Sequence, residues 1–284
     1  MLSLDGSHGE GGGQILRTAL SLAALTGTPI RIKRIRAGRP KPGLRPQHLT
    51  AVQALAQVAQ AEVTGAQLGS QELTFRPGTP KGGRYHFDVA ARTGSAGSVT
   101  LIAQALLPPL LQAGTPADVI LKGGTHVPWS PPAHYLNHVF LPTLAVMGAE
   151  VQMSLERWGW YPKGGGEVRL DIRPAHALSG VEWRPPPAGA AFRALSASAR
   201  LPEHVARRQA ARLEARLGPA VPVEIIRVNG PAPGSLVCVW GPRAGFSALG
   251  ARGKPAEQVA DEAADAFLTF QKSGAALDRH LADQ

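Results

Sequence analysis

The chain has 284 residues, of which 44% are hydrophobic and 18% charged, which predicts a globular protein of two domains and excludes a disordered chain. Its single cysteine, Cys238, excludes an internal disulfide framework and any zinc site made of several cysteines. The formal net charge of +10 favours a polyanionic partner. The first 25 residues resemble no secretory signal, and no apolar stretch approaches the roughly 20 residues that span a bilayer. We therefore expect a soluble cytoplasmic protein with no membrane partner.

A glycine-rich turn opens the first expected helix, near Gln14–Leu25. It reads His8-Gly9-Glu10-Gly11-Gly12-Gly13-Gln14-Ile15-Leu16-Arg17. Backbone N–H groups in such a turn can approach an oxyanion without obstruction by Cβ atoms, and the helix N-terminus adds partial positive charge. Arg17 follows one helical turn later, where it can add a phosphate contact, and Glu10 is a candidate metal or proton-handling carboxylate. A purely structural turn is the alternative, since neither the Walker A nor the Rossmann pattern is present.

A dense run of cations follows the start of the next expected strand, Ile30–Ile32. Its positive residues, with no acidic residue between them, are Arg31, Lys33, Arg34, Arg36, Arg39, Lys41 and Arg45. Such a block favours a polyanion, because each neutralised phosphate releases condensed counterions, whereas a solvated basic surface is the alternative. Prolines among these cations stiffen the loop and lower the entropy cost of holding guanidinium groups in place. We favour a functional loop, which Gln47 and His48 face from the start of the following helix.

The first half of the chain occurs twice. Three short strings recur in the same order, namely Gly27-Thr28-Pro29 as Gly114-Thr115-Pro116, Ala61-Glu62-Val63 as Ala149-Glu150-Val151, and Pro80-Lys81-Gly82-Gly83 as Pro162-Lys163-Gly164-Gly165. These echoes predict a repeated supersecondary unit. Each unit is expected to combine two helices with a four-stranded sheet. Because such a unit cannot bury both of its layers alone, the two copies should pack together.

Hydrophobic spacing places the remaining elements of both copies. In the first copy we expect a helix carrying Leu49, Val52, Leu55 and Ala59, and strands at Glu62–Val63, Leu73–Phe75 and Tyr85–Val89. In the second copy we expect helices at Val99–Leu111 and around Leu136–Leu144, and strands at Val119–Leu121, Val151–Leu155 and Val168–Ile172. Gly123–Ser130 takes the place of the basic loop in the second copy and has no cation. Only the first copy is therefore equipped with cations for a polyanion.

The repeat pattern stops near Pro174, and Pro185-Pro186-Pro187 marks a boundary, because a proline run cannot continue a helix or a central strand. Beyond it we expect helices at Pro202–Leu217 and Pro255–Gln271 and strands at Val221–Val228 and Leu236–Trp240. We predict a large domain at 1–183, a smaller inserted α+β domain at 184–275, and the start of a third repeat at 276–284. The charged face of the 202–217 helix is interpreted as solvated surface rather than as an RNA site.

Together these strings resemble the RNA 3′-terminal phosphate cyclase family. The matching stretches are Asp5-Gly6 with Gly9–Arg17, Arg36–Leu44 with Gln47-His48, Gly94–Ser98, Gln104, Pro131–Ala133, Pro202 with His204–Ala206, and His280–Gln284. The resemblance covers essentially the whole chain. It implies an α+β fold of three repeated units, each of two helices on a four-stranded sheet, with a smaller α+β domain inserted in the third. This is the repeat architecture that the family shares with carboxyvinyl transferases such as EPSP synthase.

The resemblance implies ATP-dependent conversion of an RNA 3′-phosphate to a 2′,3′-cyclic phosphate through enzyme-AMP and RNA-adenylate intermediates, assisted by Mg²⁺ or Mn²⁺. Glu10, Arg17 and Arg39 would be catalytic, with Glu10 also binding the metal. Arg36, Lys41 and Gln47 would bind the substrate. The nucleotide pocket would be lined by Gln104, His280, Leu281, Ala282, Asp283 and Gln284. The partner would be RNA that carries a 3′-phosphate end.

One departure from the family pattern concerns the nucleophile. The histidine that accepts AMP is expected beyond Gln284, so the chain resembles a cyclase truncated at its C-terminus, and none of its nine histidines lies in a matching context. Such a form would be impaired or inactive. A non-catalytic cyclase-like protein in ribosomal RNA processing is the main alternative, and a carboxyvinyl transferase is a third. The glycine turn, the basic loop and the terminal motif favour the cyclase.

Overall fold

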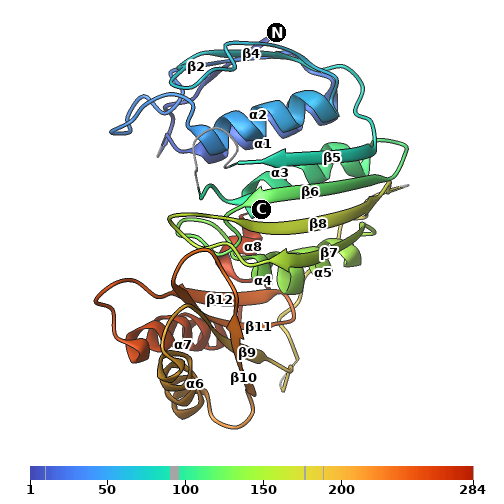
Figure 1. The fold of residues 1–284 in the computed structure, drawn as a ribbon. Coiled ribbons are helices and arrows are strands. Elements are labelled where there is room, and N and C mark those ends of the chain that lie inside the picture. The colour runs from blue at the N-terminus through green and yellow to red at the C-terminus, as the bar shows by residue number, and fades with distance from the viewer. Residues whose placement is uncertain (10, 90–95, 176, 188, 284) are drawn as a thin grey trace.

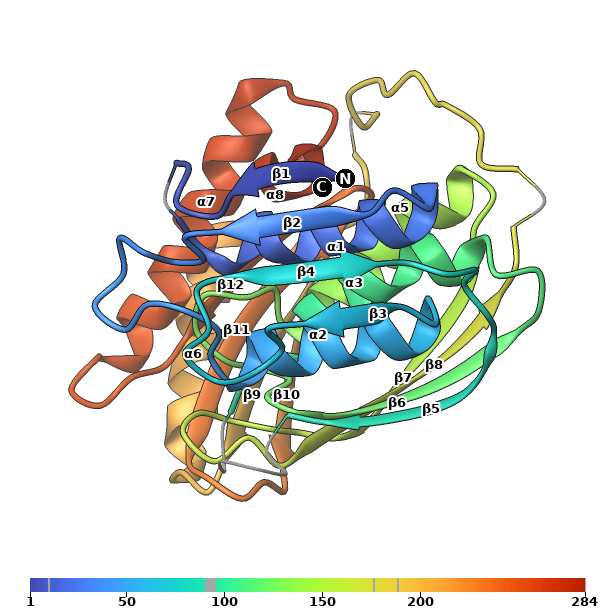
Figure 2. The same ribbon diagram turned by 90° about the horizontal axis from the view of Figure 1, so that it is seen from above.

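The computed structural model describes residues 1–284 except 10, 90–95, 176, 188 and 284. Its described strands form three four-stranded sheets with helices packed on them, as Figures 1 and 2 show. The strand orders are β1-β2-β4-β3, β5-β6-β8-β7 and β10-β9-β11-β12. The predicted α+β class with helices on four-stranded sheets is confirmed. No helix in the described part of the chain is long and apolar enough to cross a membrane.

The first unit has the element order strand, helix, strand, helix, strand, strand. Its elements are β1 (Leu2–Asp5), α1 (Gly13–Thr26), β2 (Ile30–Lys33), α2 (Pro46–Val58), β3 (Glu62–Thr64) and β4 (Leu73–Arg76). Strand β1 pairs in parallel with β2, while β4 pairs antiparallel with both β2 and β3. A glycine in the left-handed conformation, Gly27, ends α1 and turns the chain back toward the sheet.

The second unit repeats this order. Its elements are β5 (Gly83–Asp88), α3 (Val99–Leu111), β6 (Ala117–Gly123), α4 (Ala133–Tyr135), the π-helical turn η1 (Leu136–Phe140), α5 (Leu141–Val146), β7 (Glu150–Arg157) and β8 (Gly166–Arg173). Strand β5 pairs in parallel with β6, as β1 does with β2. The continuous helix expected around Leu136–Leu144 is present, with a π-helical segment in its middle.

The position of β5 corrects two expectations. The strand at 85–89 was assigned to the first sheet, whereas it opens the second sheet, and the first sheet is completed by β1, which the sequence analysis missed. The Pro-Lys-Gly-Gly strings at 80–83 and 162–165 consequently precede β5 and β8, which occupy different places in their sheets. This third echo does not mark equivalent positions, whereas the other two precede or begin equivalent strands.

A third sheet follows residue 190. Its unit contains β9 (Arg193–Ala199), α6 (Glu203–Leu217), β10 (Val223–Val228), β11 (Gly234–Gly241), β12 (Ala244–Leu249) and α7 (Ala256–Ser273), and a short helix α8 (Arg279–Ala282) comes after it. Strands β9 and β12 were not expected from the sequence. Their alanine, serine and glycine residues have low strand propensity, and β9 is fixed by its place between β10 and β11. The domain boundaries at 183 and 275 stay a prediction.

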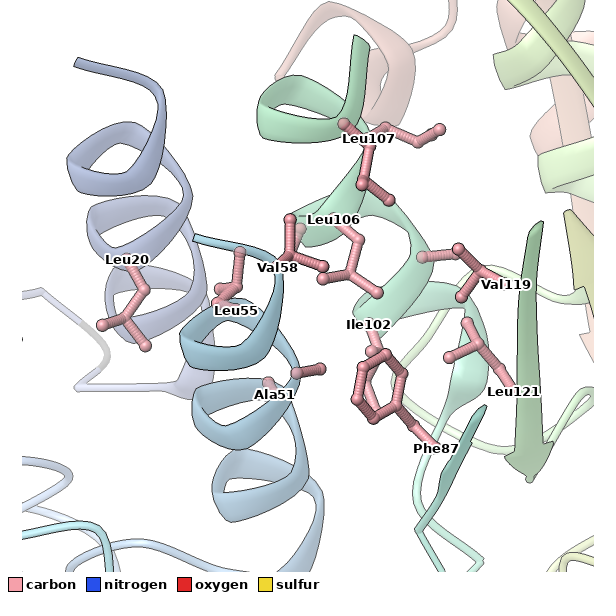
Figure 3. Close-up of a cluster of buried hydrophobic side chains, with 14 of the residues drawn as sticks. Leu20, Ala51, Leu55, Val58, Phe87, Ile102, Leu106, Leu107, Val119 and Leu121 are labelled. Atoms are coloured by element: carbon pink, nitrogen blue, oxygen red, sulfur yellow. The ribbon is translucent and has the colours of Figure 1, made fainter. Parts of the chain in front are cut away.

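The first two units share one hydrophobic core, because α1, α2 and α3 pack against one another between the two sheets. Figure 3 shows side chains of this interior, among them Leu20, Leu55, Val58, Ile102, Leu106, Val119 and Leu121. All seven are fully buried, and complete burial of each leucine stabilises the fold by about 1.5–3 kcal/mol. Residues that are far apart in the sequence meet in this core, so the core fixes the two units relative to each other.

The third sheet is buried on both faces. Helices α6 and α7 cover one face, where Phe192 and Phe267 meet edge to face. The second unit covers the other face, where Trp160 packs into a cluster with Leu195 and Leu236. A Cβ on Gly234 would lie 2.4 Å from the Trp160 ring, so a glycine lets the ring rest directly on β11. The third sheet is thereby fixed against the second unit.

Candidate functional site

The sequence motifs gather at one end of the first two sheets. Strands β1 and β2 run in parallel, as do β5 and β6, and the loops that follow them lead to the N-termini of α1, α2 and α3 and to residues 124–132. The N-termini of α1 and α2 and residues 124–132 lie on the same side of the molecule in both ribbon views, at the left of Figures 1 and 2. The carboxyl ends of parallel strands are where α/β proteins commonly bind ligands.

The glycine turn forms a cradle at the start of α1. The helix begins at Gly13, and Gly12 precedes it with extended backbone and no side-chain cap. A Cβ on Gly13 would lie 2.3 Å from His48 Nε2 and 2.8 Å from Arg17 Nη1. A Cβ on Gly12 would lie 3.5 Å from the Arg39 guanidinium. The absence of side chains at these two glycines therefore lets an imidazole and two guanidinium groups converge on the helix N-terminus, and we call Arg17, Arg39 and His48 the phosphate cluster.

Burial sets the protonation of this cluster. It lowers the pKa of Arg17 to about 10, so the guanidinium stays charged in a poorly solvated place. Burial also lowers the pKa of His48 to about 3, helped by the positive charges of Arg36, Arg17 and Arg45. The His48 ring is therefore neutral at physiological pH. Its Nδ1 accepts a hydrogen bond from the Arg45 backbone N–H at 3.2 Å, which leaves the ring proton on Nε2, facing Gly13. In this tautomer His48 presents an N–H donor, and not a lone pair, toward the start of α1.

The basic loop is more tightly held than its sequence suggests. Arg31 forms an ion pair with Glu72, and Arg34 forms one with Asp5, so both cations are paired with acids from elsewhere in the first unit. Arg36 donates its Nη1 to the backbone oxygens of Lys41 at 2.6 Å and Gly43 at 2.9 Å. The Arg36 side chain thereby holds the two ends of the loop together. Burial lowers the pKa of Arg36, and the positive charges of Arg45 and Arg39 add to the shift. Lys41 is exposed on the same loop.

The N-terminus of α3 joins the second unit to the cluster. Gln47 Oε1 accepts a hydrogen bond from the Ser98 backbone N–H at 2.9 Å, and a Cβ on Gly97 would lie 2.8 Å from Gln47 Cβ. Because this contact uses the side-chain oxygen of Gln47, its amide nitrogen remains as the hydrogen-bond donor. Ser98 caps α3 with its own side chain. Gln104 lies on the same helix, six residues after the cap, while Gly94 and Ser95 of the matching stretch lie outside the described residues.

The terminal motif is anchored by one buried carboxylate. Asp278, only 2% exposed, accepts hydrogen bonds from the N–H groups of His280 and Leu281, from the Gly245 N–H and from the Tyr135 hydroxyl. Burial, together with Asp278, raises the pKa of the Tyr135 hydroxyl, which therefore stays protonated as a donor.

Helix α8 thereby reaches the glycine turn. Leu281 is buried in the shared core, whereas His280 and Ala282 are exposed. Asp283 accepts a hydrogen bond from Gln14 Nε2 at 3.5 Å, which places the terminal motif beside the start of α1.

The structure thus brings most of the predicted residues to one end of the molecule. Glu10 and Gln284 lie outside the described residues, so the metal ligand and the last nucleotide contact stay predictions. The described part of the chain contains no group of three or more histidine, cysteine, aspartate or glutamate side chains arranged to hold a metal. The sequence analysis named His48 only as a polar group facing the loop and gave Gly13 no separate role. Their positions in the Gln-His pair and the glycine run were the available signals.

The fold and the cluster together define a class of protein, namely an α+β protein of repeated units in which two guanidinium groups and an imidazole converge on a glycine-rich helix N-terminus. The family model described as RNA 3′-terminal phosphate cyclase matches residues 8–284. The chain is 49% identical over 294 residues to the RNA 3′-terminal phosphate cyclase of Gloeothece citriformis, covering 100% of this chain and 84% of the relative. For the Methylococcus capsulatus relative of the same name the identity is 50% over 295 residues, covering 100% and 82%. For that of Archaeoglobus fulgidus it is 46% over 288 residues, covering 100% and 85%. The chain belongs to the RNA 3′-terminal phosphate cyclase family.

Proposed function

We propose that this protein converts RNA 3′-phosphate ends to 2′,3′-cyclic phosphates at the expense of ATP, with a divalent metal, Mg²⁺ or Mn²⁺, at Glu10. The observation that carries the proposal is the phosphate cluster, in which two guanidinium groups and a neutral imidazole N–H meet at a helix N-terminus. Such an arrangement suits a phosphate dianion, because charge-assisted hydrogen bonds and the helix dipole act together in a poorly solvated place. Relatives that share 46–50% of their residues carry the same activity in their names.

The chemistry proceeds by activation of a leaving group. A phosphate monoester is a poor electrophile, so a histidine first displaces pyrophosphate from ATP and holds the AMP through a P–N bond. The RNA 3′-phosphate then attacks the phosphorus of AMP and releases that histidine. A phosphoanhydride now joins the RNA to AMP. The vicinal 2′-hydroxyl attacks the 3′-phosphorus, loses its proton and expels AMP. The nucleophilic histidine expected beyond Gln284 stays a prediction, and we assign that role to none of the histidines described above.

The residues of this chain bind and orient the phosphates. Arg17 and Arg39 would neutralise phosphate oxygens, and the His48 N–H would add a neutral donor whose proton is fixed in place by the Arg45 backbone. Gln47 would present its amide nitrogen from the start of α2. Gln104 and residues 280–284 would hold the nucleotide, and the contact of Asp283 with Gln14 brings the terminal motif to the start of α1.

The proposal is tested by incubating the natural protein, in a form that includes the segment expected beyond Gln284, with ATP, Mg²⁺ and a 3′-phosphorylated oligoribonucleotide. We expect ATP-dependent cyclic ends and a protein-bound AMP that adds roughly 329 Da to the intact mass. RNA that is bound but left unchanged, with no adduct on the protein, would contradict the proposal and favour a non-catalytic cyclase-like protein in ribosomal RNA processing.

Salt dependence reports how many cations contact the RNA. If three or four phosphates are neutralised, the logarithm of the association constant should fall against the logarithm of salt with a slope of about −2 to −3 for a single strand. Arg39→Ala should weaken binding and reduce the slope by about 0.7, the contribution of one phosphate. Arg31→Ala is the control for the loss of one charge alone, because Arg31 lies on β2 and outside the phosphate cluster. Equal losses in the two variants, measured by fluorescence anisotropy, would show that the basic segment acts only through its overall charge.

A further inference from the structure

An exposed tryptophan stands at the same end of the molecule as the phosphate cluster. Trp129 is 98% exposed, the highest value among the large hydrophobic side chains described as exposed. Its backbone has φ 65°, in the left-handed region that tryptophan rarely adopts. A bulky residue held in this conformation costs free energy, and such positions concentrate at functional sites. Nothing in the packing of the fold explains why an indole should be presented to solvent here.

Hydrogen bonds fix the loop that carries Trp129. The Ser130 hydroxyl donates to the Val127 oxygen at 3.0 Å, and the Ala133 N–H donates to the Thr125 oxygen at 2.9 Å. The Thr100 hydroxyl, in the first turn of α3, donates to the Pro131 oxygen at 2.7 Å. The Trp129 loop, residues 124–132, is therefore anchored to the helix whose N-terminus contacts Gln47.

A second exposed aromatic side chain lies on the adjoining loop, residues 158–165. Tyr161 is 66% exposed and follows Trp160, which is buried. The two loops are joined because the N–H groups of Thr125 and His126 both donate to the Gly159 oxygen, at 3.1 and 3.0 Å. The buried His126 ring also stacks on Trp158, with 4.1 Å between ring centroids. Both loops leave the end of the second sheet where β6 and β7 finish, at the left of Figure 1.

The charges of these loops suit a nucleic acid strand. Neither loop contains an aspartate or a glutamate. Lys163 is exposed on the second loop and has no ion pair with any residue that the structure describes. Arg200, exposed at the end of β9, donates to the Pro231 oxygen at 3.4 Å, and Pro231 packs against Gly165. Exposed aromatic rings among unpaired cations are the usual surface for single-stranded nucleic acid, because every base can stack on a ring.

We propose that Trp129 and Tyr161 are stacking platforms for the bases of single-stranded RNA whose 3′-phosphate lies at the phosphate cluster. This inference rests on the proposed function and adds a strand-binding surface to it. The first unit would hold the terminal phosphate through its cations, and the second unit would hold the preceding bases through its aromatic rings. The substrate preferred over a duplex end would then be an unpaired 3′ strand.

The test is the affinity of the 284-residue protein for a fluorescent, 3′-phosphorylated single-stranded oligoribonucleotide, measured by anisotropy without ATP. Trp129→Ala is expected to weaken binding by about 5- to 150-fold, the range for loss of one base stack, and Tyr161→Ala by a similar factor. Trp129→Phe keeps a ring and should restore most of the affinity. Trp183→Ala is the matched control, since segment 174–192 leaves β8 at the opposite end of the second sheet.

Each outcome separates this inference from the proposed function. If Arg17→Ala loses the RNA while Trp129→Ala binds like the unaltered protein, the platform is wrong and the phosphate cluster stands. Equal losses for Trp183→Ala and Trp129→Ala would also overturn the platform. A change in the molecular mass of Trp129→Ala by light scattering, without a change in affinity, would make Trp129 an interface residue instead. Failure of the unaltered protein to bind any RNA would remove both the platform and the proposed function.

Discussion

Replacing Gly13 by alanine is expected to lower the affinity for a 3′-phosphorylated oligoribonucleotide by about 100-fold or more while leaving the fold intact. The new Cβ would lie 2.3 Å from His48 Nε2 and 2.8 Å from Arg17 Nη1, so both groups must move away from the start of α1. Two charge-assisted hydrogen bonds of about 1.5–3 kcal/mol each would be displaced, which gives the expected factor. Because the obstructed atoms belong to side chains, the backbone can keep its course, and overpacking should lower the free energy of unfolding by only about 1–3 kcal/mol.

Gly38→Ala provides the matched control for this experiment. Gly38 lies in the basic loop, its backbone is not in the left-handed region, and a Cβ there would meet nothing within 4 Å. It should bind RNA like the unaltered protein. The comparison of 3′-phosphorylated with 3′-hydroxyl oligonucleotides then assigns the loss to the terminal phosphate. If Gly13→Ala bound both oligonucleotides as tightly as the unaltered protein, the cradle at α1 would not be the phosphate site.

Helices were the most predictable elements of this fold. The spacing of apolar residues located α1, α3, α6 and α7 to within one or two residues, because each has a face or a body that must be buried. The strand β9 was missed for the opposite reason. Its sequence, Arg193-Ala194-Leu195-Ser196-Ala197-Ser198-Ala199, has little strand propensity, and pairing on both edges with β10 and β11 fixes its conformation. Those partners lie many residues away, where a local pattern carries no information about them.

The order of strands explains the other errors. Strand β1 has only four residues, and its partner β2 follows after an intervening helix. Without β1 the first unit lacked a fourth strand, and β5 was the nearest candidate. Two of the three repeated strings were reliable because they precede or begin equivalent strands, whereas the Pro-Lys-Gly-Gly strings are turns of similar composition at different places. A repeat is better located by the order of its elements than by short identical strings.

The functional site was predictable as a list of motifs and not as a geometry. The glycine turn and the basic loop were found from the sequence, because their composition is unusual for plain surface. The convergence of Arg17 and His48 on Gly13 depends on the packing of α1 beside α2, and the neutral state of His48 depends on burial. The pairing of Arg31 with Glu72 also depends on tertiary structure. Sequence reasoning consequently overcounted the cations open to RNA and undervalued the histidine.

The free energy of unfolding is expected to fall as the pH is lowered from 6.5 to 5, by up to about 2 kcal/mol for His126 alone. This side chain is 1% exposed, and burial, followed by the proximity of His134, lowers its pKa well below the ordinary 6.5. Below pH 6.5 the unfolded chain binds a proton at this residue and the folded chain does not, so acid favours unfolding by about 1.4 kcal/mol per pH unit. Urea denaturation at pH values from 7.5 to 5 measures the loss, above the range in which most carboxylates titrate.

The surroundings of His126 disfavour protonation of its ring in the folded state. His126 Nε2 lies 2.9 Å from His134 Nδ1, and burial, then the charge of His138, lowers the pKa of His134 to about 4. No carboxylate pairs with either ring in the described part of the chain, so a new positive charge there would have no counter-ion. His126→Gln should therefore flatten the pH dependence by up to one proton even if it lowers stability at every pH. The exposed His204→Gln should keep the original slope. If the free energy of unfolding of His126→Gln fell with pH as steeply as that of the unaltered protein, the acid sensitivity would lie elsewhere. The contact between loops 124–132 and 158–165 would then tolerate a positive charge on His126.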